Sequence, residues 1–210
     1  MASPLKPDST AGNPGLALRG AITPFRLNRL MEFTLAAILI LHTSVLRLEG
    51  HRWWCQCGGW SPWVSDTNSI HNSQHLFDPY SFSHVQHGLL FCGLCAWLLP
   101  SVAVGWHFVA AMAVEAMWEM AENSSFVIDR YRTATIALNY YGDSLANSWG
   151  DILSCAIGFV AARYLGLWAS IALFVIIEVT MAFWIRDSLL LNVLMLIHPI
   201  DAMKAWQSAH

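Results

Sequence analysis

Five apolar segments, each close to the length needed to cross a lipid bilayer, constrain the fold of this chain more than any other feature. A membrane-spanning helix needs about 20 mostly apolar residues. Because hydrocarbon offers no hydrogen-bond partners, a crossing segment must satisfy its own backbone, most simply as a helix. The pattern therefore predicts an all-α fold, a polytopic transmembrane helix bundle with five spans. The segments cover residues 30–48, 79–99, 102–123, 144–165 and 168–185.

The parts of the chain outside these segments complete the predicted organisation. A sixth apolar stretch, 188–200, is short, and predicts a short C-terminal helix that is re-entrant or interfacial, or a sixth span extended to Trp206. Residues 1–28 are rich in proline and glycine and predict a flexible arm. Residues 29–206 are then a single transmembrane helical domain.

Composition supports lipid as the main solvent of this domain. Of the 210 residues, 56% are hydrophobic and 12% are charged, whereas soluble domains carry about 25% charged residues. The net charge of −3 provides no basic field for nucleic acid. The expected partner is membrane lipid, and the basic arm, with Arg26 and Arg29, predicts a cytoplasmic N-terminus.

Acidic, amide and imidazole side chains collect at one end of the predicted bundle, on the outer side when the N-terminus is cytoplasmic. At 100° per residue, the members contributed by each helix share a face. Ionisable groups at membrane depth indicate a site, because exposing them to lipid is costly. We therefore expect an outward-facing polar cavity. Its members are His84 and His87 in the second segment, Glu115, Glu119 and Glu122 in the third, and Asp143, Asn147 and Asp151 in the fourth.

Imidazole and carboxylate groups together suit zinc or another divalent metal, or general acid–base chemistry. The predicted metal ligands are His84, His87, Glu119 and Glu122. The predicted catalytic residues are His87, Glu119, Asp143, Asn147 and Asp151. Arg130 and Arg132 are candidates to bind the anionic group of a substrate.

The same residues also have purely structural interpretations. Glu122 could lie in interfacial water, and Glu119 or Asp151 could pair with an arginine in a purely structural network. Cys55 and Cys57 form C-Q-C in a polar loop. They suit a thiol pair or a soft metal site, but two ligands at this spacing are weak evidence for either. The H-N-S-Q-H segment further along that loop adds two histidines.

Three functional hypotheses follow. The first is an enzyme, a metal-assisted hydrolase or transferase acting on a lipid or envelope substrate. The second is an ion- or proton-binding transport protein that uses deeper groups such as Glu115, Glu178 and His42. The third is a structural subunit of an envelope complex with no catalysis.

Three motifs, NSQHLFDPYSFSHVQHG, EAMWEMAENSSFVIDRYR and YYGDSLANSWGD, resemble those of a family of uncharacterised bacterial multi-pass inner-membrane proteins, a domain of unknown function. The resemblance covers roughly residues 30–206 and implies the bacterial inner membrane as location. The order His87, Glu119, Arg130 or Arg132, then D-x-x-x-N-x-x-G from Asp143, is more distantly similar to VanZ-like membrane proteins. The sequence departs from the VanZ-like pattern at Glu122, where those proteins tend to have glutamine.

Overall fold

The structure, a computed structural model, describes residues 25–135 and 140–209. It confirms an all-α fold: the described residues form seven helices and no strand, apart from an isolated bridge between Trp63 and Phe77. The helices are α2 (Arg29–Leu48), α3 (Ser81–Leu98), α4 (Val104–Glu122), α5 (Ser125–Ala134), α6 (Leu145–Trp184), α7 (Leu189–Ile197) and α8 (Asp201–Ser208). Of the predicted arm, residues 1–24 lie outside the described residues.

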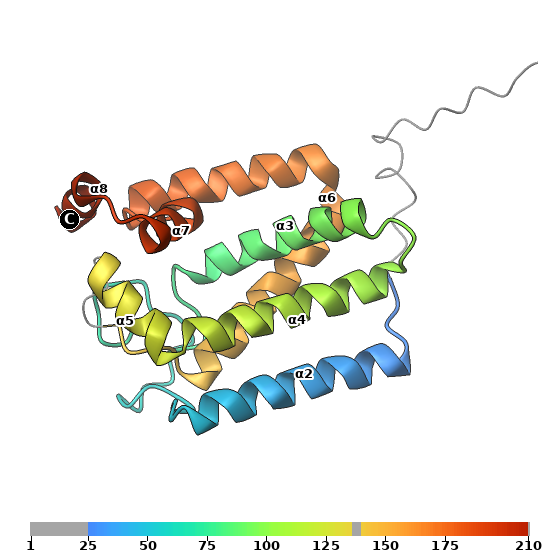
Figure 1. Cartoon of the computed structure of the whole chain (residues 1–210), viewed down its shortest axis with the longest axis horizontal. Coiled ribbons are helices and arrows are strands. Elements are labelled where there is room, and N and C mark those ends of the chain that lie inside the picture. The colour runs from blue at the N-terminus through green and yellow to red at the C-terminus, as the bar shows by residue number, and fades with distance from the viewer. Residues whose placement is uncertain (1–24, 136–139, 210) are drawn as a thin grey trace, which may run out of the picture.

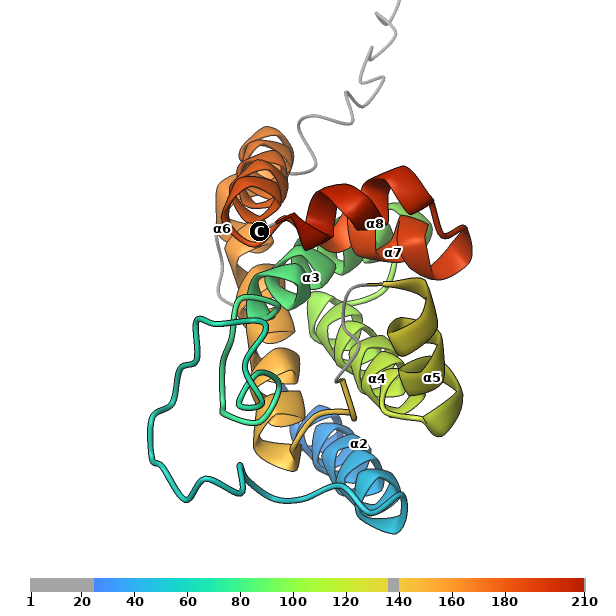
Figure 2. The ribbon, with the colours of Figure 1, turned by 90° about the vertical axis from the view of Figure 1, so that its left-hand side faces the viewer.

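The long helices run side by side between the two ends of a bundle (Figure 1). α3 packs along α6, and α4 packs against α2, α3 and α6. The loop of residues 49–80 and the short helices α5, α7 and α8 gather at one end, as both views show (Figures 1 and 2). That end also holds the start of α3, the end of α4 and the start of α6 (Figure 1).

The prediction of five separate spans is not supported. The fourth and fifth apolar segments are the two helical halves of α6, which meet at a sharp turn at Gly166, where the backbone leaves helical geometry (φ 73°, ψ 178°). Among the described helices, two are long and apolar enough to cross a membrane, α2 and α6. α3 and α4 do not meet that standard, and both contain imidazole or carboxylate groups that lower their hydropathy.

The two qualifying helices expose most of their apolar surface. Only 17% of the apolar window of α2 and 11% of that of α6 are buried within the chain. A core helix of a water-soluble protein would be mostly buried, and large exposed apolar surfaces mark membrane or protein contacts. The predicted short C-terminal helix is α7, which at 9 residues is too short to span a bilayer alone.

Close backbone contact between α3 and α6 aligns the helices that carry the polar residues. A Cβ at Gly158 would overlap the carbonyl oxygen of Val85, and one at Gly88 would overlap that of Cys155. Small residues allow this approach. A core around Phe159, Met112 and Leu89 fills the bundle beside the contact.

Candidate functional site

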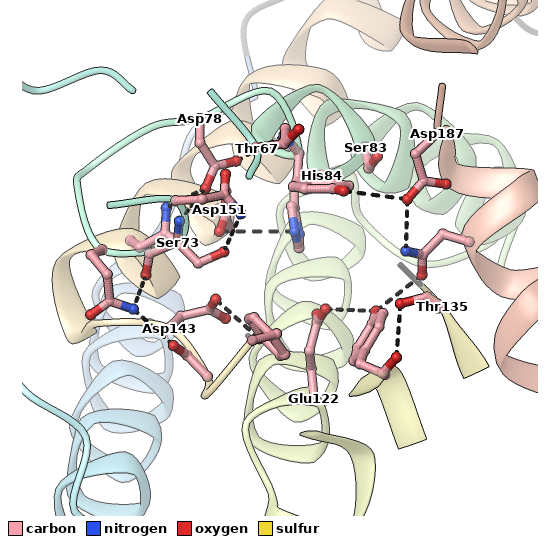
Figure 3. Close-up of a pocket in the computed structure, with 18 of the residues that line it drawn as sticks. Thr67, Ser73, Asp78, Ser83, His84, Glu122, Thr135, Asp143, Asp151 and Asp187 are labelled. Carbon is pink, nitrogen blue, oxygen red and sulfur yellow. Dashed lines mark hydrogen bonds and ion pairs between the residues drawn. The ribbon is translucent and has the colours of Figure 1, made fainter. Parts of the chain in front are cut away.

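A cavity of about 340 Å³ opens at the loop end of the bundle. Its lining residues come from α3, α4, α5, α6 and α7 and from the loop that precedes α3. Figure 3 shows His84 facing the space around which Asp78, Asp143, Asp151 and Glu122 are arranged. Of the predicted site residues, six line the cavity: His84, His87, Glu122, Asp143, Asn147 and Asp151.

His84, on the first turn of α3, is the centre of the cluster. Its Nδ1 lies 2.5 Å from Oε1 of Glu115 and 3.3 Å from Oε1 of Glu119. Its Nε2 lies 3.9 Å from Oδ2 of Asp151 on α6. One imidazole thus faces carboxylates from two other helices, as the helical spacing predicted.

Glu115 connects the two histidines of α3. Its Oε2 lies 2.9 Å from Nδ1 of His87, and its side chain is fully buried. The ring of His87 stacks on Phe91, with centroids 5.7 Å apart, and meets the edge of Trp118. Glu115 was recognised as part of the acidic face of its helix but was not among the predicted ligands, and the structure places it in direct contact with both histidines.

Glu119 sits behind His84, held from the opposite side by a hydrogen-bond chain. Ser148 Oγ donates to Oε2 of Glu119 over 2.6 Å, and Nε2 of His42 lies 2.7 Å from the same Oγ. The other carboxylate oxygen of Glu119, Oε1, is buried without a hydrogen-bond partner. It approaches His84 Nδ1, but that nitrogen lies closer to Glu115. A buried, unpartnered carboxylate oxygen calls for a proton or a cation.

The loop residues of the cavity form a second acidic group. Asp143 accepts hydrogen bonds from Asn123 (2.8 Å) and Tyr140 (3.0 Å). Asp78 accepts from the backbone N–H groups of Ser73 and Tyr80. Burial, followed by the charge of Asp143, raises the pKa of Asp78 to about 6, and burial also raises the pKa of Asp143.

The remaining predicted residues of the cavity form hydrogen bonds with neighbouring side chains. Asn147 donates to Asp78 over 3.4 Å, and Ser81 donates to Asp151 over 2.9 Å. Glu122 accepts from the hydroxyl of Tyr131 on α5, at 2.8 Å. These bonds hold the carboxylates in fixed positions around the cavity.

Acidic groups dominate the cavity. Five of the described lining residues are carboxylic acids, and none is lysine or arginine. Uncompensated charges are costly to bury, so ionised carboxylates here require a positive partner. The acids are Asp78, Glu122, Asp143, Asp151 and Asp187, and Asp187 was not predicted from the sequence.

The structure does not bring Arg130 and Arg132 into this cavity. Arg130 donates to the carbonyl oxygens of Leu196 and Ile197, which ties α5 to α7. Arg132 donates to the carbonyl oxygen of Tyr140. Both guanidinium groups therefore bind backbone carbonyl oxygens, and neither arginine is among the residues that line the cavity.

The donor set fits a divalent metal ion. Ligand atoms of His84, His87 and Glu115 lie within 4.8 Å of one another, as do those of His84, Glu119 and Glu122. In a tetrahedral zinc site, nitrogen and oxygen ligands about 2.0–2.2 Å from the metal lie about 3.4 Å apart. His84 Nδ1 and Glu119 Oε1 are 3.3 Å apart, close to that spacing, and a metal bound at Nδ1 would replace the 2.5 Å contact of this nitrogen with Glu115.

Comparison with known proteins identifies the family. A family model described as a protein of unknown function, DUF2585, matches residues 46–209. A UPF0314 protein of Paracoccus denitrificans is 43% identical over 82% of this chain and 89% of its own length. UPF0314 proteins of Rhizobium meliloti and Sinorhizobium fredii are 44% and 45% identical, each over 81% of this chain and 87% of their own length.

No solved structure matches the chain. The resemblance to VanZ-like proteins stays a prediction, whereas the resemblance to an uncharacterised bacterial family is confirmed. The chain belongs to the DUF2585 family, whose function is unknown, together with the UPF0314 proteins.

Proposed function

We propose that this protein is a multi-pass protein of the bacterial inner membrane that binds a divalent metal ion, such as zinc, in its acidic cavity. It uses that ion to hydrolyse, or transfer a group from, a lipid or envelope substrate at the outer leaflet. The observation that carries the proposal is the convergence of His84, His87 and three glutamates beside a cavity lined by acids without a lysine or arginine among its described residues.

The arrangement of the helices supports the multi-pass topology. α2, α3, α4 and both halves of α6, divided at Gly166, run between the same two ends of the bundle (Figure 1). A cytoplasmic N-terminus then places the cavity end outside. α7, with Leu190 and Ile197 exposed by 60% and 76%, suits a helix lying in the interface beside the cavity.

The charge of the cavity favours a bound cation. The described residues of the site supply two imidazoles and seven carboxylates, counting Glu115 and Glu119 behind the five lining acids. Protons or a divalent ion must offset this negative charge. The unpartnered Oε1 of Glu119, 3.3 Å from Nδ1 of His84, is one oxygen that such a cation would bind.

Each residue has a role in this proposal. His84, Glu119 and Glu122 hold the ion, and Ser148 and His42 orient Glu119 as outer partners. A divalent ion held there would supply Lewis acidity for hydrolysis or group transfer.

The remaining groups act on the substrate. His87, fixed by Glu115, serves as the general base or acid. Leu189 and Val193 of α7 provide an apolar wall that an acyl chain would contact.

The test combines metal content with activity in detergent-purified protein. The double variant His84→Ala/His87→Ala should lose one equivalent of metal, measured by elemental analysis, and should lose hydrolysis of inner-membrane lipid extracts. His107→Ala is the matched control, because His107 is a buried histidine bonded to the Leu99 carbonyl oxygen, near the α3–α4 turn. Equal metal content in the double variant and the control, with both folded, would refute the proposal.

A second candidate is cation or proton binding without catalysis. The chain from His42 through Ser148 and Glu119 to His84 connects α2, α6, α4 and α3 by contacts of 2.7, 2.6 and 3.3 Å. Such a chain is typical of proton relays. Metal- or proton-dependent flux in proteoliposomes, lost in Ser148→Ala while no substrate is turned over, would favour this function over the enzyme.

A further inference from the structure

Two cysteines and two histidines meet in the long loop between α2 and α3, away from the acidic cluster. Cys55 and Cys57 come from the C-Q-C segment, and His71 and His75 from H-N-S-Q-H. One ligand atom from each of the four lies within 4.8 Å of the others. Both thiols are free. The two short segments that were weak evidence separately, C-Q-C and H-N-S-Q-H, thus form one cluster of four possible ligands.

The spacing of the donor atoms matches tetrahedral zinc. Sγ of Cys55 lies 3.2 Å from Nδ1 of His71, and Sγ of Cys57 lies 3.5 Å from Nε2 of His75. With zinc–sulfur and zinc–nitrogen bonds of about 2.3 and 2.0–2.1 Å, sulfur and nitrogen ligands lie about 3.6 Å apart. Two thiols with two imidazoles are a ligand set that selects zinc among common divalent ions.

The surroundings of the four residues also suit metal ligands. Nδ1 of His75 lies 2.5 Å from the carbonyl oxygen of Ser61, which leaves Nε2 free to bind. Metal-binding histidines commonly donate their second N–H to such an acceptor. Backbone N–H groups of Cys57 and Gly59 point at Sγ of Cys55 and Cys57, at 3.4 and 3.3 Å, and such donors stabilise thiolates.

We propose that Cys55, Cys57, His71 and His75 form a structural zinc site that fixes the loop of residues 49–80 over the cavity. All four positions of the ion are filled by protein, as in structural rather than catalytic sites. The loop has no helix or strand of its own, and metal binding would contribute free energy to the folding of such a segment. Residues 67–70 and 72–74 of this loop line the cavity, so a zinc ion bound by His71 and His75 would hold one of the cavity walls.

Cobalt(II) substitution tests this site separately from the cavity, where the proposed ligands contain no sulfur. The full chain, purified in detergent under reducing conditions, is stripped with a chelator and titrated with Co2+. We expect a thiolate-to-cobalt charge-transfer absorption that saturates as Co2+ is added and disappears when Zn2+ is added in excess. Cys55→Ser/Cys57→Ser should abolish the band, whereas Cys95→Ser, which changes a thiol of α3 outside the set, should retain it.

The variants also separate this proposal from the function proposed above. His84→Ala/His87→Ala should keep the cobalt–thiolate band, and His71→Ala should weaken it even if the double cysteine variant fails to fold. Stripping zinc should increase proteolytic cleavage within residues 49–80, and adding zinc back should restore protection. Absence of the band in reduced wild-type protein, or its persistence in the double cysteine variant, would overturn the site whatever the cavity binds.

Discussion

Asp187, between α6 and α7, is a buried acid whose ionisation makes the stability of the folded chain depend on pH. It is 3% exposed and accepts hydrogen bonds from Ser188, Tyr80, Asn192 and Gln207, all of them uncharged. Burial raises its pKa from 3.8 to about 6. The folded state therefore holds this proton more tightly than the unfolded chain, and the associated stability is lost as the pH rises between about 4 and 6.

The magnitude follows from the same shift. One pKa unit corresponds to about 1.4 kcal/mol, so burying the ionised carboxylate costs about 3 kcal/mol at neutral pH, of which about 2 kcal/mol appears between pH 4.5 and 7.5. Asp187→Asn removes this charge at nearly constant shape. The stability of the variant relative to wild type should therefore improve by about 2 kcal/mol over that range, or roughly 4–8 °C in melting temperature for a chain of this size.

The assay is the melting temperature of detergent-purified wild type and Asp187→Asn at both pH values. Comparing the change with pH, rather than the absolute stability, cancels any constant effect of altered hydrogen bonds. Asp129→Asn is the control, because the Asp129 carboxylate is 73% exposed. If the difference between wild type and Asp187→Asn is the same at pH 4.5 and 7.5, the inference that a buried, uncompensated charge lies here is refuted.

Two further changes test the site and its scaffold. Ser148→Ala should weaken metal binding about 10–100-fold in a titration, because Glu119 Oε2 loses its hydrogen-bond donor. Ser154→Ala should leave the affinity unchanged, because the Ser154 hydroxyl only donates to a backbone carbonyl oxygen within α6. Equal affinities of the two variants would show that Ser148 has no part in the site. Gly158→Ala should destabilise the protein by about 1–3 kcal/mol or more, because the added Cβ would meet the backbone of α3. Gly93→Ala, which has open space around its Cβ, should be neutral or slightly stabilising. Equal thermal stability of these two variants would contradict the close contact between α3 and α6.

The position of the site along the helices could be predicted from the sequence, because helical spacing determines which side chains share a face. His84, Glu119 and Asp151 were expected to converge, and the structure places them around one imidazole. A break between the fourth and fifth apolar segments was expected, and the backbone leaves helical geometry between them, at Gly166.

Contacts within the loops could not be predicted, because they depend on tertiary structure rather than on the helical periodicity of the sequence. Ser144 caps α6, whereas the carboxylate of the neighbouring Asp143 accepts a hydrogen bond from Asn123. Arg130 binds carbonyl oxygens of α7, which no local pattern indicates. Cys55 and His71 meet only because the loop folds back on itself.

The most direct test of a metal-binding cavity is anomalous X-ray diffraction at the zinc absorption edge from crystals of the full chain. We expect an anomalous peak about 2.0–2.2 Å from a ring nitrogen of His84 and from carboxylate oxygens of Glu119 or Glu122, separate from any peak in the loop of residues 49–80. Zinc-soaked crystals with an ordered cavity but no peak among these side chains would contradict it.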